Sequence, residues 1–555
     1  MEYILTKRTV VLLYFLLSLV YISGLFIPLM ENDSAQHATM AMQIYLHNDF
    51  TLLMKGFNDY LDKPHMHFWL SALSFKLFGL SHWAYRIPAL LFTILGAFSS
   101  YKLAEEFYGS KAGHLASLIF LSAQAIILSN HDVRTDAVLT GASIFAIWQL
   151  VMYINTEKLK NAILGSVGLG IAFSTKGQLA IFITGIMIFC YLLYNRKWHT
   201  LLNWKVLVAI FTFLLTSSPM LYAYYQQFDL HPEKVINGQT NVSGIRFIFW
   251  DQSFNRLTGS GFESNNTDYL FFFHTLLWAF LPWGLIVYFA IFDRTKQFIK
   301  TKFRYDKNME FLTIGGFWLV MIIINLSKSK LPHYMNSLFP VLAVLLSGYL
   351  VYLYKNSNQK ILKVLLGVQY FIVIVGSILG FLLMFFVFDL PNIAFIIVYI
   401  LLFVTLVYTV IKKQELVSKI MVISVLFSVF VNFGLNTQFY PKLLNYQAGN
   451  SMVHIIKEKD IDPNNIYMME GSQSWTLNFY TARETPEIAV SNINNIKGKW
   501  LFVYDKDMNK LKSKNITWDK SIEVDQFKVT RLSMSFLNPK TRNSVLGKAY
   551  LLQIN

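Results

Sequence analysis

Long apolar runs repeat along most of the chain and leave few folds open to it. A helix needs about 20 mostly apolar residues to cross the hydrocarbon core of a bilayer, and about thirteen runs have roughly that length. Lipid-exposed backbone must satisfy its own hydrogen bonds, so such runs predict membrane-spanning helices. The predicted spans are 9–29, 84–106, 112–130, 135–155, 160–175, 177–195, 205–225, 268–292, 311–326, 334–354, 361–387, 391–411 and 417–436.

Composition supports this prediction of a polytopic all-helical membrane domain over residues 1–436. Hydrophobic residues make up 54% of the 555 residues and charged residues only 14%, whereas soluble domains carry about 25% charged residues. The net charge of +16 comes from Lys and Arg spread through short loops, which favours membrane anchoring over nucleic-acid binding. The single cysteine, Cys190, lies in an apolar run and excludes an intramolecular disulfide.

Basic residues predict the orientation of the chain. Lys7 and Arg8 precede the first run, which is longer than the apolar core of a signal peptide and is interpreted as a retained helix. Basic residues collect on the cytoplasmic side of membrane proteins. The N-terminus is therefore predicted to be cytoplasmic. With an odd number of spans, residues 437–555 are predicted to be external.

The external side also carries the long segments. The first external loop, about 30–83, contains the apolar stretch Phe68–Leu80, which is too short to span and predicts an interfacial helix. Short β-rich stretches among polar turns predict a small α/β domain over residues 437–555. The predicted strands are Ile466–Met469, Trp500–Tyr504 and Val524–Leu532.

Ionisable residues at the ends of membrane spans are costly and mark candidate functional sites. Those that stand out all fall on the predicted external side. Carboxylates beside cations at one interface suit an anionic lipid headgroup and a hydroxyl acceptor. The residues are Asp33, Tyr60, Asp62, Lys63, His65, Asp132, Arg134, Asp136, Lys176, Lys328, Lys330, His333 and Tyr334.

Each of these residues also has a simpler interpretation. Asp33 is otherwise a solvated loop residue, and Lys176 otherwise a lysine that reaches the interface along its alkyl chain. Tyr60 and Tyr334 fit an interfacial aromatic belt. Asp62, His65 and His67 offer ligands to a divalent metal, or else only surface polarity.

Five short segments carry a family resemblance. They are Asp33 after the first span, Tyr60-Leu-Asp62-Lys63-Pro64, Arg134-Thr-Asp136, Gly168 to Thr175-Lys176-Gly177, and Lys330-Leu-Pro-His-Tyr334. In this order they resemble the GT-C glycosyltransferases that use polyprenyl-phosphate sugars, and most the aminoarabinose lipid A transferase and protein O-mannosyltransferase superfamily. A further stretch with Phe249, Arg256 and Leu281–Trp283 is also similar. The chain departs from the family pattern at Ser34, His65 and Gln178.

The resemblance implies roles for these residues. Asp33 would be the catalytic base, Asp62 and Asp136 supporting acids, and the donor phosphate would be bound by Lys63, Tyr60, Arg134, Lys176, Lys330 and Tyr334. It also implies a polyprenyl-phosphate sugar donor, a bacterial inner membrane, and lipid A, a glycan or a protein as acceptor. It implies no certain cofactor, and metal dependence stays open.

The functional hypothesis is therefore transfer of a sugar from a polyprenyl-phosphate carrier to a hydroxyl acceptor at the external face, with inversion at the anomeric carbon. A lipid-linked sugar flippase or other secondary transporter is the main alternative, and a membrane scaffold is a third. Transporters usually show internal repeats and broken helices near the bilayer midplane. The ionisable residues here gather at one interface, and no G-x-G-x-x-G or P-loop motif is present that would indicate nucleotide-driven transport.

Overall fold

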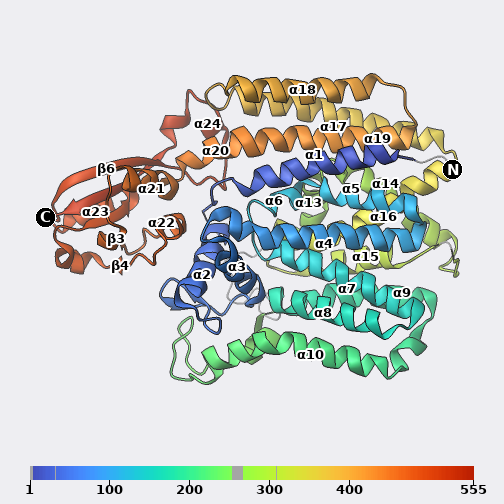
Figure 1. Cartoon of the computed structure of the whole chain (residues 1–555), viewed down its shortest axis with the longest axis horizontal. Helices are drawn as coiled ribbons and strands as arrows, with labels where there is room; N and C mark the ends of the chain where they lie inside the picture. The colour runs from blue at the N-terminus through green and yellow to red at the C-terminus, as the bar shows by residue number, and fades with distance from the viewer. Residues whose placement is uncertain (1–3, 32, 253–266, 308) are drawn as a thin grey trace.

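The computed structural model describes residues 4–31, 33–252, 267–307 and 309–555. Its long helices run side by side, with the N-terminus at one end of the bundle and the C-terminal sheet at the other (Figure 1). Within these ranges, nine helices are long and apolar enough to cross a membrane. The protein is therefore a multi-pass membrane protein. The nine are α1 (Lys7–Leu25), α4 (His82–Tyr108), α7 (Asp136–Thr156), α9 (Gln178–Asn195), α10 (Lys205–Tyr224) continued to Asp229, the turn η4 (Pro332–Leu338) with α16 (Phe339–Lys355), α17 (Gln359–Phe385), α18 (Ile393–Ile411), and α19 (Leu416–Gly434) continued to Tyr446.

The other four predicted spans are helical but shorter, broken or less apolar, so the count of thirteen is not confirmed. The run 112–130 forms α5 (Ser110–Leu121) and α6 (Gln124–Leu128), and the run 268–292 forms α13 (Phe271–Ala279) and α14 (Gly284–Lys300). Pro282 lies in the second break and lacks the N–H that a continuous helix needs. The remaining two are α8 (Leu159–Lys176) and the 15-residue α15 (Leu312–Leu326).

Burial separates central from lipid-facing helices. Almost every residue of α16 from Phe339 to Val351 is buried, because α16 packs against α4, α5, α14 and α15. In contrast, α17 and α18 leave large apolar side chains such as Ile378 and Leu401 exposed. Exposed apolar faces of this kind suit contact with lipid chains.

In the sequence, two helices follow α1 and precede α4. They lie at the end of the bundle next to the C-terminal sheet (Figure 1). They are α2 (Asp33–His47) and α3 (Met66–Phe78), joined through a hairpin of β1 (Met54–Lys55) and β2 (Asn58–Asp59). The predicted interfacial helix agrees with α3, displaced by two residues. Asp33 was predicted to lie in a loop, whereas it is the first residue of α2.

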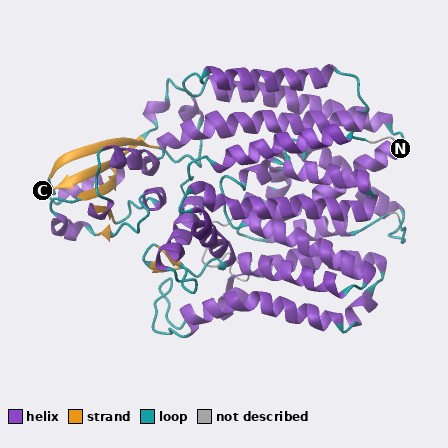
Figure 2. Cartoon of the chain, viewed as in Figure 1, coloured by secondary structure: helices purple, strands orange, loops and turns teal. Residues whose placement is uncertain are grey.

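The C-terminal sheet has the strand order β4-β3-β5-β7-β6. In the described part of the chain the only other strands are those of the short hairpin (Figure 2). β3 pairs in parallel with β4 and β5, whereas β7 pairs antiparallel with β5 and β6. Together with its helices this forms the predicted small α/β domain. The elements are α21 (Ala448–Glu458), β3 (Ile466–Met469), α22 (Trp475–Tyr480), β4 (Glu487–Ile488), β5 (Trp500–Tyr504), α23 (Asp505–Ser513), β6 (Trp518–Gln526), α24 (Met534–Leu537) and β7 (Gly547–Ile554).

Two of the three predicted strands match β3 and β5 residue for residue. The third predicted strand, Val524–Leu532, is wrong after Gln526, because β6 ends at that residue. The chain leaves the sheet there because the backbone N–H of Phe527 donates to the carbonyl oxygen of Tyr446 at 2.7 Å. The ring of Phe527 also stacks on Phe536 at 4.0 Å between centroids. Residues after 526 are thereby drawn toward the membrane helices.

The sheet domain is held on the linker between α1 and α2. The Glu31 carboxylate accepts hydrogen bonds from the backbone N–H groups of Trp475 (2.7 Å) and Thr476 (3.1 Å) at the start of α22. The Tyr480 hydroxyl accepts from the backbone N–H of Leu29 at 2.8 Å. A carboxylate at a helix N-terminus satisfies backbone donors that the helix itself leaves unpaired. The segment leading to Asp33 is thus anchored to the C-terminal domain.

Candidate functional site

Arg134 connects two carboxylates next to the sheet domain. Its Nη1 lies 3.1 Å from Asp33 Oδ2, and its Nη2 lies 3.0 Å from Asp132 Oδ2. The Asp33 side chain is 50% exposed and that of Asp132 14%. Burial raises the pKa of Asp132 despite the opposing charge of Arg134. Asp33 is therefore the carboxylate of this pair that solvent and a bound molecule can reach.

A second ion pair is buried where α7, α8 and η4 meet. Lys176 Nζ lies 2.5 Å from Asp136 Oδ1, and the two side chains are 2% and 4% exposed. The same ammonium lies 5.2 Å from the ring centroid of Tyr334. Lys176 therefore does not reach out to water, so the simpler interpretation of this lysine is wrong. His333 Nδ1, 3.4 Å from Arg134 Nη1, connects this pair to the first.

The Tyr60–Lys63 segment lies between β2 and α3. Lys63 Nζ is 2.6 Å from Asp62 Oδ2, and the Tyr60 hydroxyl donates to the same oxygen at 3.5 Å. His37 lies one helical turn after Asp33 on α2. Burial holds the pKa of His37 well below its usual value, and the charges of Lys63 and Arg134 lower it further. Both cations therefore lie near one imidazole beside Asp33.

Lys330 lies in the loop between α15 and η4, and its ammonium is 5.2 Å from the ring centroid of Tyr269. It is 5% exposed. Gln252, which the sequence analysis did not single out, donates to the backbone carbonyl of Asp62 at 2.7 Å. Arg256 falls outside the described residues.

The predicted metal ligands do not come together. No three His, Cys, Asp or Glu side chains form a metal-binding group within the described ranges. Asp62 pairs with Lys63, while His65 packs beside the rings of Trp69 and Tyr224. His67 Nε2 lies 3.1 Å from the Tyr85 hydroxyl. The prediction assumed a strand, but Met66 begins α3, and in a helix residues two apart point in different directions.

The buried histidines predict acid sensitivity. Burial lowers the pKa of His65 from 6.5 to about 4, so the unfolded chain binds a proton between about pH 6.5 and pH 4 while the folded protein does not. Stability should therefore fall as the pH drops through this window. In His65→Phe the fall in melting temperature between about pH 7 and pH 4.5 should be smaller than in the wild type. An equal fall in both proteins would contradict this account.

Arg86 explains why the two segments of the site meet. It is fully buried in α4, and its guanidinium donates to the carbonyl oxygens of Leu25 (2.8 Å), Ile27, Pro28 (3.2 Å) and His131 (2.9 and 3.0 Å). The planar guanidinium carries several donors in a fixed geometry. It therefore ties the linker before Asp33 to the loop before Arg134. Arg86 was not among the residues predicted from the sequence, although an arginine inside an apolar run was a signal.

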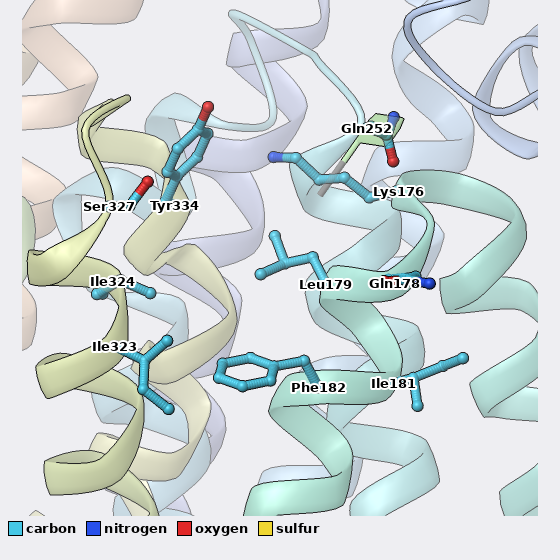
Figure 3. Close-up of a pocket in the computed structure, with 10 residues that line it drawn as sticks. All are labelled: Lys176, Gln178, Leu179, Ile181, Phe182, Gln252, Ile323, Ile324, Ser327 and Tyr334. Carbon is cyan, nitrogen blue, oxygen red and sulfur yellow. The ribbon is translucent and has the colours of Figure 1, made fainter. Parts of the chain in front are cut away.

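An apolar groove lies between α9 and α15 and has a volume of roughly 450 Å³. Figure 3 shows Lys176 and Tyr334 directed toward each other across its upper end. Its lower walls are Leu179, Phe182, Ile323 and Ile324. The groove therefore offers an apolar channel that ends at a buried cation.

A second cavity of roughly 480 Å³ lies at the Arg134 ion pairs. Asp132, Arg134, Asp136 and His333 form its polar part. Its other walls are largely apolar and include residues of the C-terminal domain. They are Met30, Ala125, Leu128, Trp278, Ala279, Pro332, Leu443, Val529 and Leu532, with Ser129, Asn336, Tyr440 and Thr530 between them. Asp136 and its partner Lys176 separate this cavity from the groove.

The amino-acid sequence is similar to those of known proteins. Residues 62–222 match the family model described as dolichyl-phosphate-mannose-protein mannosyltransferase. A relative from Edwardsiella ictaluri, named undecaprenyl phosphate-alpha-4-amino-4-deoxy-L-arabinose arabinosyl transferase, is 25% identical over 63% of this chain and 61% of its own length. A relative of the same name from Pseudomonas aeruginosa is 25% identical over 61% of this chain and 58% of its own length. The chain thus spans about three fifths of these curated relatives.

The crystal structure of ArnT from Cupriavidus metallidurans bound to undecaprenyl phosphate covers 98% of this chain and of its own, with a TM-score of 0.74 at 17% identity. The chain therefore shares the fold of this structure. The region of the chain that the family model matches contains Lys63, Arg134 and Lys176. Asp33 and Tyr334 lie outside that region and join it only through the tertiary contacts described above.

Proposed function

We propose that this protein transfers a sugar from a polyprenyl-phosphate carrier to a hydroxyl group of an acceptor. The observation that carries the proposal is the apolar groove that ends at Lys176 and Tyr334. Asp136, the partner of Lys176, lies two residues after Arg134, which pairs with Asp33. A long apolar chain with one anionic group suits such a groove. The names of the arabinosyl transferase relatives and the undecaprenyl phosphate in the ArnT structure support this class of donor.

The shape and lining of the groove support a position for each end of the donor. The isoprenoid chain lies along the apolar walls, and the phosphate lies at Lys176 and Tyr334. Lys63, Tyr60, Arg134 and Lys330 add cationic and hydroxyl groups on the same side of the bundle. Preorganised cations stabilise charge that develops on a leaving group. The leaving lipid phosphate therefore needs charge stabilisation more than it needs protonation.

Asp33 acts as the general base. Its carboxylate takes the proton of the acceptor hydroxyl while that oxygen forms a bond to the anomeric carbon. The bond from the anomeric carbon to the phosphate oxygen breaks, and its electron pair stays on the polyprenyl phosphate. Asp33 then returns the proton to water, which its half-exposed side chain contacts. Attack opposite the leaving group inverts the anomeric carbon.

Arg134 orients Asp33, and Asp136 pairs with Lys176 in its buried position. Asp62 likewise forms an ion pair with Lys63. The acceptor enters through the second cavity, which Arg134 lines. The basic loops at the other end of the bundle support a cytoplasmic location of that end. The reaction thus takes place at the external face of the membrane. In a bacterium this is the external face of the inner membrane.

A direct experiment separates this function from lipid transport. Purified protein in detergent is incubated with a labelled polyprenyl-phosphate sugar and a lipid extract of bacterial envelopes. A transferase moves the label to a new covalent product and releases polyprenyl phosphate. A flippase gives no product, because detergent solution has no second compartment. Recovery of only intact donor, across several sugars, would overturn the proposal.

A further inference from the structure

One wall of the second cavity comes from the C-terminal domain. Val529, Thr530 and Leu532 line the cavity together with Arg134 and Asp132 of the membrane domain. Val529 is buried, whereas the Leu532 side chain is 42% exposed. These residues belong to the segment 527–532, which leaves the sheet after β6. The C-terminal domain is thus part of the cavity rather than only a neighbour of it.

Arg542 fixes the position of the region that follows this segment through ring contacts and hydrogen bonds. Its guanidinium carbon lies 4.7 Å from the ring centroid of Phe388 and 5.3 Å from those of Tyr446 and Phe536. It also donates to the Phe536 carbonyl (3.0 Å), the Tyr446 hydroxyl (3.1 Å) and the Val387 carbonyl. Cation–π contacts and hydrogen bonds together order an arginine more than either does alone. The clamp joins the loop between α17 and α18, the end of α19 and the 527–536 region.

The cavity has a polar and an apolar side. Arg134, Asp132 and His333 form the polar side, while Leu128, Trp278 and Leu532 are apolar. A molecule that fills it presents polar groups to the ion pairs and an apolar portion to the other wall. Burying apolar surface against a leucine favours binding. A fully hydrophilic acceptor would make no apolar contact with that wall.

We infer that residues 529–532 of the C-terminal domain form part of the acceptor site and select an acceptor that carries an apolar portion beside its reacting hydroxyl. The inference rests on the proposed function. It assigns the C-terminal domain a part in substrate choice. It also accounts for the end of β6 at Gln526: the chain leaves the sheet where it begins to line the cavity.

The test compares two substitutions in one segment. Leu532→Gln removes an apolar side chain that lines the cavity, whereas Met534→Gln changes an 84% exposed side chain that does not line it. Leu532→Gln should raise the KM for a lipid-linked acceptor about tenfold or more, with the affinity for polyprenyl phosphate unchanged. Met534→Gln should leave both values at the wild-type level. The melting temperatures of the two variants show whether folding is intact.

A second acceptor tests the chemical class. A short water-soluble glycoside with the same reacting hydroxyl should be a poor substrate of the wild type, and Leu532→Gln should change its KM little. The inference is overturned if Leu532→Gln and Met534→Gln behave alike, or if the wild type uses the soluble glycoside as well as the lipid. Transfer by the wild type to neither acceptor would instead overturn the proposed function, and this inference with it.

Discussion

Asp33→Asn is expected to lower the rate of sugar transfer by at least about a hundredfold, because an amide cannot accept the proton of the acceptor hydroxyl. The substitution is nearly isosteric, so the shape of the site is retained. The Asp33–Arg134 ion pair is half-exposed, and exposed pairs contribute only about 0–1 kcal/mol to stability. The variant should therefore fold, remain in the membrane and still bind polyprenyl phosphate.

Asp460→Asn provides the matched control. Asp460 lies in the C-terminal domain, is exposed, and has a φ of 50°, a backbone conformation in which Asn is well tolerated. Loss of that carboxylate should leave transfer unchanged. The measurement is initial transfer rate at saturating donor and acceptor. Near-normal transfer by Asp33→Asn would remove Asp33 as the base, and a similar loss in Asp460→Asn would indicate a nonspecific effect of charge.

Lys176→Met is expected to weaken both the fold and the binding of the donor. It removes the partner of Asp136, whose side chain is only 4% exposed, and breaking a buried ion pair costs about 3–5 kcal/mol. It also removes the cation at the head of the apolar groove. The melting temperature in detergent and the affinity for polyprenyl phosphate should therefore both fall.

The double variant Lys176→Met, Asp136→Asn separates these two effects. Removing both charges leaves no uncompensated buried ion, so most of the melting temperature should be regained. The affinity for polyprenyl phosphate should stay low, by about tenfold or more, because the cation is still missing. If affinity returns together with stability, Lys176 has only a structural role, and the phosphate position proposed here is wrong.

Much of the membrane architecture follows from local sequence. Hydropathy reports how each segment interacts with hydrocarbon, and this interaction hardly depends on where the other helices lie. The helical runs, the interfacial α3, and the strands Ile466–Met469 and Trp500–Tyr504 were therefore predictable. The clustering of Asp33, Arg134 and Lys176 at one end of the bundle was predictable for the same reason, because each lies at the end of a run.

The pairings inside that cluster were not predictable. Nothing local distinguishes Asp136 from Asp132 as the partner of Lys176, since the choice depends on how α7 and α8 pack against each other. The metal alternative for Asp62, His65 and His67 assumed a strand, whereas His65 precedes a helix. The end of β6 at Gln526 depends on Phe527 meeting Tyr446 and Phe536, which are distant in sequence or lie beyond the strand.

The amino-acid sequence alone was thus sufficient to establish a multi-pass helical protein with its ionisable residues at one interface, because a bilayer acts on each segment separately. The three-dimensional packing was needed to show that Arg86 ties the segments of Asp33 and Arg134 together, and that Lys176 heads an apolar groove. It was also needed to reveal the contribution of the C-terminal domain to the second cavity. Ion pairs and cavities form between residues far apart in the chain, so they depend on contacts that no local pattern encodes.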